Sequence, residues 1–311
     1  MNSKKLLINI FLLFIWLSNI SNSTENKIIL KIDRDIITTL DIKEETKYLS
    51  ALNPKLMELN DDKIFKISKE SLIREKIKQI EILKNRKDTD LSDKFLNQII
   101  ENRYKSLGIE TKDEFIKYLK DLDIQIDTVI NKIKIEAIWN QLIIYKFSEK
   151  IKIDKNKLKK NIQLNKNLIE TKEFLLNEIV FNIDQNLNLD EKYKIIKDSI
   201  QNTGFENTAS IYSISDTSKL GGLLGWVNEN SLNLKIKKII SRLKMGEYSE
   251  PIILPGGFLI LKISDIKVIK KKFDINKELA KAVNSETNRQ LNQFSNIYFN
   301  KIKKEISINE I

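Results

Sequence analysis

Acid–base chemistry in this 311-residue sequence can come only from carboxylates, lysines and tyrosines, because the chain contains no histidine and no cysteine. These absences exclude a Ser-His-Asp or Cys-His nucleophile pair, an imidazole or thiolate metal site, and a disulfide. A metal ion would need oxygen ligands alone, and no Asp/Asn run has calcium-loop spacing. The sequence also has no GxxxxGK(S/T) phosphate loop. We therefore expect no metal and no cofactor.

The net charge of +11 comes from lysine, since only six of the 54 basic residues are arginine. The basic residues alternate with acidic ones along the chain and do not gather in one stripe. A nucleic-acid-binding protein would show arginine-rich patches with interleaved aromatic residues. We therefore interpret the lysines as a solvated surface and expect no nucleic acid partner.

The N-terminus has the order of regions typical of a secretory signal. Lys4 and Lys5 precede a largely apolar run of 12 residues, LLINIFLLFIWL (6–17), and a small polar stretch follows at 18–23. The run is shorter than the roughly 20 residues of a spanning helix. We predict a cleavable signal peptide over residues 1–23, with an uncleaved membrane anchor as the alternative. An exported chain without cysteine does not rely on disulfides, which favours a periplasm.

Glycine and proline divide the mature chain into parts. Seven of the eight glycines fall between Gly204 and Gly257, and two of the three prolines are Pro251 and Pro255. Turn chemistry is therefore concentrated in one block, with long periodic sequence on both sides. The length is sufficient for two modules that each bury a core.

The first part reads as a strand hairpin followed by helices. KIILKI (27–32) predicts a strand, Arg34-Asp35 a turn and residues 36–38 a return strand. Apolar residues at helical spacing then predict helices from about Leu40 onward, including one over 126–147. Thr111 and Glu114 have the spacing of a capping box at the start of a helix.

The block from 171 to about 270 predicts a small α+β domain. FLLNEIVF (174–181) is strongly β-prone, 190–202 is helical and ends at Gly204, and a polar helix is predicted over 232–244. Glycine-rich strands precede and follow that polar helix. The order implies helices packed on an antiparallel sheet. A long amphipathic helix follows, whose apolar face must pack on another part of the molecule.

Three motifs in this block resemble the parvulin-type prolyl isomerase domain. They are GGLLGW (221–226), GEYSEP (246–251) and GGFLILKI (256–263), which follow a strand and helices in the expected order. The wider layout is similar to that of the SurA-like periplasmic chaperones. The resemblance covers essentially the whole mature chain, with one parvulin module where SurA proper has two.

The resemblance implies an α+β fold with a helical N-terminal chaperone domain that a C-terminal helix completes, and one parvulin-like domain with a small antiparallel sheet. The implied boundaries are 1–23 for the signal peptide, 24–170 for the N-terminal domain, 171–270 for the parvulin-like domain and 271–311 for the C-terminal helix. The helix over 271–311 would pack on the N-terminal domain through residues such as Leu291, Phe294 and Tyr298.

The same resemblance assigns positions to the missing histidines. Catalytic parvulins usually carry two histidines, and the matching positions here are Glu178 and Leu259. A third polar position falls near Ser215 or Asp216. The residues implied to bind the substrate proline are Leu232, Ile236, Trp226 and Phe258. The pocket would stay apolar while its polar centre is replaced, which predicts weak or absent isomerase activity.

The resemblance implies that the protein binds unfolded or nascent outer-membrane β-barrel proteins and proline-containing peptides in the periplasm, and meets a membrane only through its signal peptide. The alternative is an active prolyl isomerase that acts as a foldase of exported proteins. A lipoprotein foldase would need a lipobox cysteine, which is absent, so that class is excluded. A purely structural protein would leave the parvulin motifs unexplained.

Overall fold

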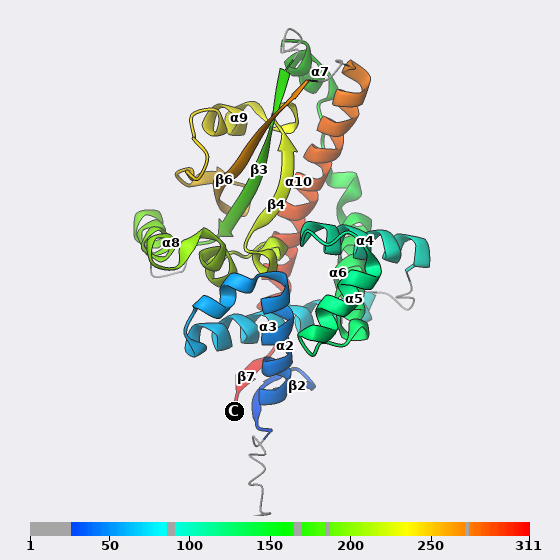
Figure 1. Cartoon of the computed structure of the whole chain (residues 1–311), viewed down its shortest axis with the longest axis vertical. Coiled ribbons are helices and arrows are strands. Elements are labelled where there is room, and N and C mark those ends of the chain that lie inside the picture. Colours follow the sequence, from blue (N-terminus) through cyan, green and yellow to red (C-terminus); the bar gives the residue numbers. More distant parts are fainter. Residues whose placement is uncertain (1–25, 86–90, 165–169, 184–186, 271–273) are drawn as a thin grey trace, which may run out of the picture.

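The structure is a computed structural model that describes residues 26–85, 91–164, 170–183, 187–270 and 274–311. The predicted signal peptide, residues 1–23, lies outside the described residues. A helical part occupies the lower half of Figure 1 and a part built around a sheet occupies the upper half. The long helix α10 (Ile275–Lys303) runs along both.

The helical part begins with the predicted hairpin of β1 (Ile28–Ile32) and β2 (Asp35–Thr38). Its turn lies at Asp33 and Arg34, one residue earlier than expected, and Asp33 has a φ of 53°. Aspartate tolerates this left-handed conformation better than most residues. The elements that follow are α2 (Thr39–Leu52), η1 (Pro54–Glu58), α3 (Asp61–Asn85), α4 (Asp93–Ser106), α5 (Lys112–Asp121), α6 (Ile126–Phe147), η2 (Ser148–Lys150) and α7 (Lys155–Leu164). The last of these, α7, lies at the top of Figure 1 and packs against α10.

The predicted capping box forms at the start of α5. The backbone N–H of Glu114 donates to Thr111 Oγ1 at 3.2 Å, and the backbone N–H of Thr111 donates to Glu114 Oε2 at 3.2 Å. Two N–H groups that have no partner inside the helix are thereby satisfied. The sequence signal at 111–114 therefore gave the correct helix start.

A short C-terminal strand, β7 (Ile308–Glu310), joins the N-terminal hairpin, and the sequence analysis did not predict it. The sheet has the order β2-β1-β7, and both pairings are antiparallel. Ile32 lies opposite Ile308 and Leu30 lies opposite Glu310. The two ends of the described chain therefore meet in one sheet.

The upper part contains the predicted small antiparallel sheet, which has four strands in the order β4-β3-β6-β5. Its elements are β3 (Glu170–Phe181), α8 (Leu189–Tyr212), η3 (Asp216–Leu220), β4 (Leu223–Asn228), η4 (Glu229–Ser231), α9 (Leu234–Ile240), β5 (Ile252–Leu254) and β6 (Gly257–Lys270). The central pair is β3 with β6, which is antiparallel along the whole of β3.

The helix expected over 190–202 does end at Gly204, whose φ of 81° and ψ of 164° are not helical, and a second helix then continues to Tyr212, so α8 consists of two helices with a kink between them. Glycine adopts such a φ without the steric cost that a Cβ would bring. α9 is shorter than the expected 232–244, and its start is fixed by Asn233, which caps it by accepting a hydrogen bond from the Ile236 N–H at 2.9 Å.

α10 completes the hydrophobic core of the helical part. Its Phe294 ring stacks on Phe147 of α6 with the centroids 5.1 Å apart, and Trp139 Nε1 donates to Ser295 Oγ at 2.8 Å. Tyr298 stacks on the same tryptophan at 5.9 Å. The apolar face predicted from the sequence is therefore buried against a helix about 150 residues earlier in the chain.

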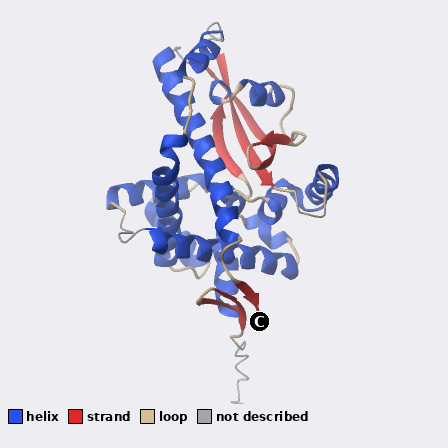
Figure 2. Cartoon of the chain, turned by 180° about the vertical axis from the view of Figure 1, so that it is seen from behind, coloured by secondary structure: helices blue, strands red, loops and turns tan. Residues whose placement is uncertain are grey.

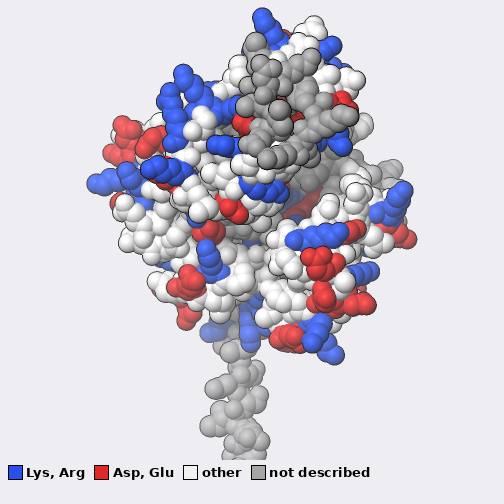
Figure 3. All heavy atoms as spheres, turned by 45° about the horizontal axis from the view of Figure 1, so that its top comes forward, with Lys and Arg blue, Asp and Glu red and all other residues white. Residues whose placement is uncertain are grey.

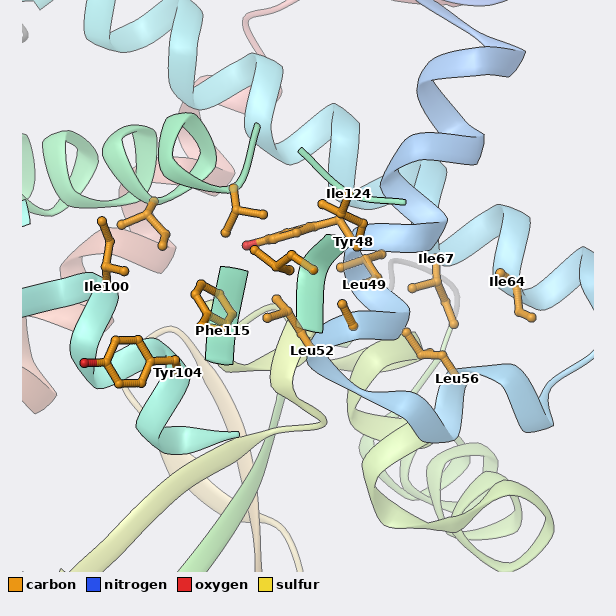
Figure 4. Packing of buried hydrophobic residues seen from close by; sticks show 14 of the residues in the cluster. Tyr48, Leu49, Leu52, Leu56, Ile64, Ile67, Ile100, Tyr104, Phe115 and Ile124 are labelled. Atoms are coloured by element: carbon orange, nitrogen blue, oxygen red, sulfur yellow. The ribbon is translucent and has the colours of Figure 1, made fainter. Parts of the chain in front are cut away.

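A second core cluster lies among α2, η1, α3, α4, α5 and α6, around Tyr48 and Phe115 (Figure 4). Ile211 of α8 and Leu220 of η3 pack against this cluster, so the two parts share apolar contacts. Figure 2 shows the sheet beside α10, with most of the helical part below it. The predicted α+β class, with a C-terminal helix that completes the helical part and one small antiparallel sheet domain, is confirmed.

Candidate functional site

A cavity of about 340 Å³ lies between the sheet and α10. Strand β3 contributes Leu176, Glu178 and Val180, which share one face because side chains alternate along a strand. Strand β6 contributes Leu259, which lies opposite Val180, and Leu261, which lies opposite Glu178. The antiparallel register of β3 and β6 thus places an apolar floor around a single carboxyl group.

Glu178 is held at this floor by two hydroxyl groups. Its Oε1 accepts hydrogen bonds from Ser215 Oγ at 2.7 Å and from Thr217 Oγ1 at 2.9 Å. Burial raises the pKa of Glu178, and the negative charge of Asp216 acts in the same direction, while the two hydroxyl bonds oppose it. The carboxyl group therefore keeps its proton to a higher pH than an exposed glutamate does.

Asp216 does not line the cavity, although the sequence analysis placed it near the third polar position. Its Oδ1 lies 2.6 Å from Lys78 Nζ and 3.5 Å from Arg74 Nη2, both on α3. Burial alone would raise the pKa of Asp216, but these two cations outweigh burial and hold the pKa well below its usual range. Of the two candidates for this position, the structure brings Ser215 to Glu178 and directs Asp216 to the helical part.

The other end of η3 is also fixed to the helical part. Lys219 Nζ lies 2.9 Å from Glu136 Oε1 on α6, and Arg103 Nη2 lies 3.0 Å from Glu136 Oε2. Burial would raise the pKa of Glu136, but Lys219 and Arg103 lower it overall. The segment that carries Ser215 and Thr217 is therefore held between two groups of ion pairs with the helical part.

Two of the four predicted substrate-binding residues line the cavity and two do not. Leu232 and Ile236 form part of its wall. Phe258 lies on the opposite face of β6 from Leu259 and stacks on Phe181 with the centroids 5.5 Å apart. Trp226 lies opposite Leu175 on the reverse face of the sheet, where Lys267 Nζ is 4.0 Å from its ring centroid. The alternation of strand side chains thus places Trp226 and Phe258 outside the cavity.

The sequence analysis did not predict that α10 forms the other wall. This wall is polar and its residues recur at helical spacing: Ser285, Glu286, Asn288, Arg289, Asn292, Gln293 and Asn296. The spacing was visible in the sequence, but a polar helix face is usually interpreted as solvated. Only the packing of α10 beside the sheet shows that this face lines a cavity.

The arrangement can hold an apolar group next to neutral hydrogen-bonding groups. The floor is aliphatic, the carboxyl of Glu178 is already bonded to two hydroxyls, and the α10 wall presents amides. Within the described residues, no group of three or more acidic residues is placed to bind a metal ion. The described part of the chain also has no helix long and apolar enough to cross a membrane.

Comparisons with known proteins agree with the geometry of the sheet-based part. Residues 168–265 match the family model of the rotamase, or PPIC-type PPIASE, domain. The chain is similar to "Chaperone SurA" of Pseudomonas putida, with 24% identity over 183 residues that cover 56% of this chain and 43% of that protein. It is also similar to "Chaperone SurA" of Methylococcus capsulatus, with 23% identity over 162 residues that cover 49% of this chain and 36% of that protein.

The chain thus matches less than half the length of these relatives. Among solved structures, one from a study of two SurA-like chaperones of Campylobacter jejuni is 17% identical and covers 92% of this chain and 99% of that chain, with a TM-score of 0.33. The resemblance expected from the sequence, to SurA-like chaperones with a parvulin-type domain, is confirmed.

Proposed function

We propose that this protein is a periplasmic chaperone that holds unfolded outer-membrane β-barrel proteins, and that its parvulin-type domain has weak or no prolyl isomerase activity. The observation that carries the proposal is the composition of the cavity. Its wall from the sheet-based part is aliphatic and suited to a client side chain, and the one carboxyl group in that wall, on Glu178, is already bonded to Ser215 and Thr217. The matching positions for catalytic histidines hold Glu178 and Leu259.

The expected loss of isomerase activity follows from what the reaction requires. Rotation about an X–Pro bond is opposed by a barrier of about 20 kcal/mol. An isomerase lowers this barrier by stabilising the twisted amide with suitably placed polar groups in a dry pocket. Leu259 offers no polar group, and an ionised Glu178 would accept hydrogen bonds without donating any. The cavity can therefore bind a proline-containing segment with little stabilisation of the twisted state.

The holding function needs apolar contact and a soluble exterior. An unfolded β-barrel chain presents alternating apolar side chains and unpaired strand edges, and it aggregates unless they are covered. Figure 3 shows lysine and arginine side chains interspersed with acidic ones over one face of the molecule. Such a surface supports the solubility of a complex with an apolar client.

Export to the periplasm rests on the N-terminal sequence. The two lysines, the apolar run and the small polar stretch in residues 1–23 predict a cleavable signal peptide. Mass spectrometry of the mature N-terminus from a periplasmic extract tests this prediction. A protein that retained Met1 and fractionated with membranes would support the anchored alternative.

Two assays on one preparation of the mature chain test the proposal. The first follows aggregation of a denatured outer-membrane β-barrel protein after dilution, and the second follows isomerisation of a proline-containing peptide without a coupled protease. We expect suppressed aggregation at stoichiometric excess and little isomerisation. The variant Leu232→Ala, in the cavity wall, should weaken suppression, whereas Ile253→Ala, 67% exposed on β5, should not. No suppression by the wild type would contradict the proposal.

The second candidate function is an active prolyl isomerase, and the raised pKa of Glu178 favours it. A protonated carboxyl group in a dry cavity can donate a hydrogen bond to an amide, which an ionised one cannot. Isomerase activity from this source would be present at acidic pH and decrease as pH rises through the pKa of Glu178. A pH profile of the isomerase assay distinguishes this candidate, because the chaperone proposal expects low activity throughout.

A further inference from the structure

We infer that the cavity is a two-sided peptide site, in which α10 binds the backbone of an extended client segment through Gln293 while the parvulin-type domain binds an apolar side chain. This inference rests on the proposed function, since it specifies how the same site holds its client. It assigns a binding role to a helix outside the parvulin-type domain.

The two walls of the cavity have different chemistry. The wall from the parvulin-type domain is largely aliphatic, with Leu176, Val180, Ile236 and Leu259. The facing residues of α10 are uncharged amides at several positions, among them Asn292 and Asn296. An extended peptide presents side chains on one side and, between them, backbone carbonyl and N–H groups. The aliphatic wall is therefore suited to the side chains of an extended peptide, and the amide wall to its backbone groups.

Gln293 supplies the most specific observation. Its Nε2 is fully buried and has no hydrogen-bond partner among the described residues. A buried donor without a partner costs free energy, about 1–3 kcal/mol, so native structures rarely retain one. Gln293 lines the cavity, so a turn of its side chain would present this donor to a carbonyl oxygen of a bound segment. The unpaired donor therefore indicates a ligand with an acceptor atom.

The charged residues of the same wall indicate that this ligand is neutral. Arg289 donates to Glu286 through Nε at 2.9 Å and through Nη2 at 2.5 Å, so the two charges neutralise each other at the edge of the cavity. Gln290 Nε2 also donates to Glu286, at 2.7 Å. An anionic ligand would need a cation that is not already paired in this way. A peptide carbonyl is the neutral acceptor that an unfolded chain provides in abundance.

A second cavity gives the bound segment room to continue. It has a volume of about 530 Å³, is lined by α7, α9 and α10, and shares Leu232, Asn233, Glu286 and Arg289 with the first cavity. Because the two cavities adjoin along α10, a chain can extend from one into the other. An extended segment of several residues therefore fits this surface better than a single side chain does.

Binding of a labelled peptide to the mature chain tests the inference. The probe is an uncharged decapeptide of alternating valine and tyrosine with one central proline, and fluorescence anisotropy gives its Kd. Gln293→Met preserves the shape of the side chain and removes the donor, so we expect Kd to increase about threefold to tenfold. Gln293→Glu, which replaces the donor with an acceptor, should weaken binding at neutral pH at least as much. The matched control is Asn284→Ala, an exposed amide of α10 outside the cavity, which should change Kd less than twofold.

Thermal unfolding separates a binding role from a structural one. Because the donor has no partner in the described chain, Gln293→Met should melt at the same temperature as the wild type or higher. If the wild type binds the peptide and both Gln293 variants bind it with the same affinity, the inference is overturned. A lower melting temperature for Gln293→Met would also overturn it, because it would show that the amide stabilises the fold. Failure of the wild type to bind any peptide would instead contradict the proposed function, and the inference with it.

Discussion

Lys78 Nζ lies 2.6 Å from Asp216 Oδ1, and this ion pair joins α3 of the helical part to the first residue of η3 in the parvulin-type domain. The Lys78 side chain is only 5% exposed, so its charge has little contact with water. The residue before Asp216 is Ser215, which donates to Glu178 in the cavity. The position of the cavity's polar centre therefore depends on a charge pair that the helical part supplies.

The first prediction concerns the removal of this carboxylate. Asp216→Asn leaves the buried Lys78 charge without its strongest partner, so we expect the free energy of unfolding to fall by about 1–3 kcal/mol. Part of the charge on Asp216 is screened by solvent, because its side chain is 38% exposed. Urea unfolding of the mature chain measures the effect. The matched control, Asp198→Asn, changes an exposed aspartate of α8 and should alter stability by less than about 0.5 kcal/mol.

The second prediction is the pH dependence of that loss. The pKa of Asp216 in the folded chain lies below its ordinary value of 3.8, so the unfolded chain binds the proton first as pH falls. The stability from the pair is therefore fully present well above pH 3.8 and is lost as pH falls through the folded pKa. The difference in unfolding free energy between wild type and Asp216→Asn should narrow from pH 6.5 to pH 3. An equal difference at both pH values would contradict this assignment.

The third prediction concerns Glu178, whose pKa is shifted in the opposite direction. Burial raises its pKa above the ordinary value of 4.5, so the folded chain keeps the proton longer than the unfolded chain does. Its contribution to stability is therefore present at low pH and decreases as pH rises from about 4.5 through the folded pKa. Glu178→Gln stays neutral and can still accept from Ser215 and Thr217.

We therefore expect Glu178→Gln to be more stable than the wild type at pH 8 and nearly equal to it at pH 4.5. Urea unfolding at the two pH values measures the difference. Glu58→Gln, which makes the same carboxyl-to-amide change at an exposed position of η1, is the control. A variant that was less stable than the wild type at pH 8 would show that the ionised carboxylate stabilises the fold.

The sequence predicted the elements whose signals are local. The β1–β2 hairpin, the capping box at Thr111 and the order of elements in the parvulin-type domain follow from strand alternation, cap chemistry and helical spacing. Strand β7 was missed because it has three residues and only one apolar side chain, and it is stabilised by backbone pairing with β1. No periodicity within three residues can indicate such a pairing.

In the candidate site, too, local sequence signals were informative and long-range packing was not predicted. Among the residues that the parvulin motifs indicated, Ser215 donates to Glu178 in the structure, and Leu232, Ile236 and Leu259 line one cavity. The motifs did not distinguish the two faces of the sheet, so Trp226 and Phe258 were grouped with Leu232 and Ile236, and they gave no indication of the α10 wall. Gln293 is 115 residues from Glu178 in the sequence, and only tertiary packing places the two on one cavity.

The last prediction concerns a glycine of the GGLLGW motif. Gly222 has a φ of +78°, and a Cβ at this position would lie 2.2 Å from the carbonyl oxygen of Glu178, a backbone atom that cannot move freely. The Glu178 N–H donates to the Gly222 carbonyl at 2.8 Å, so the two backbones must approach this closely for β3 to pair at the cavity floor. Gly222→Ala therefore introduces both a strained φ and a clash.

Gly225→Ala is the matched control, because Gly225 has a similar φ of +85° but open space where a Cβ would lie. We expect Gly225→Ala to lower the free energy of unfolding by about 1–2 kcal/mol, the cost of the left-handed conformation alone. Gly222→Ala should cost at least about 2 kcal/mol more, since the clash adds to the same strain. Urea unfolding of both variants measures the gap. Equal destabilisation would mean that β3 can move away from Gly222, and that the close approach does not fix the position of Glu178.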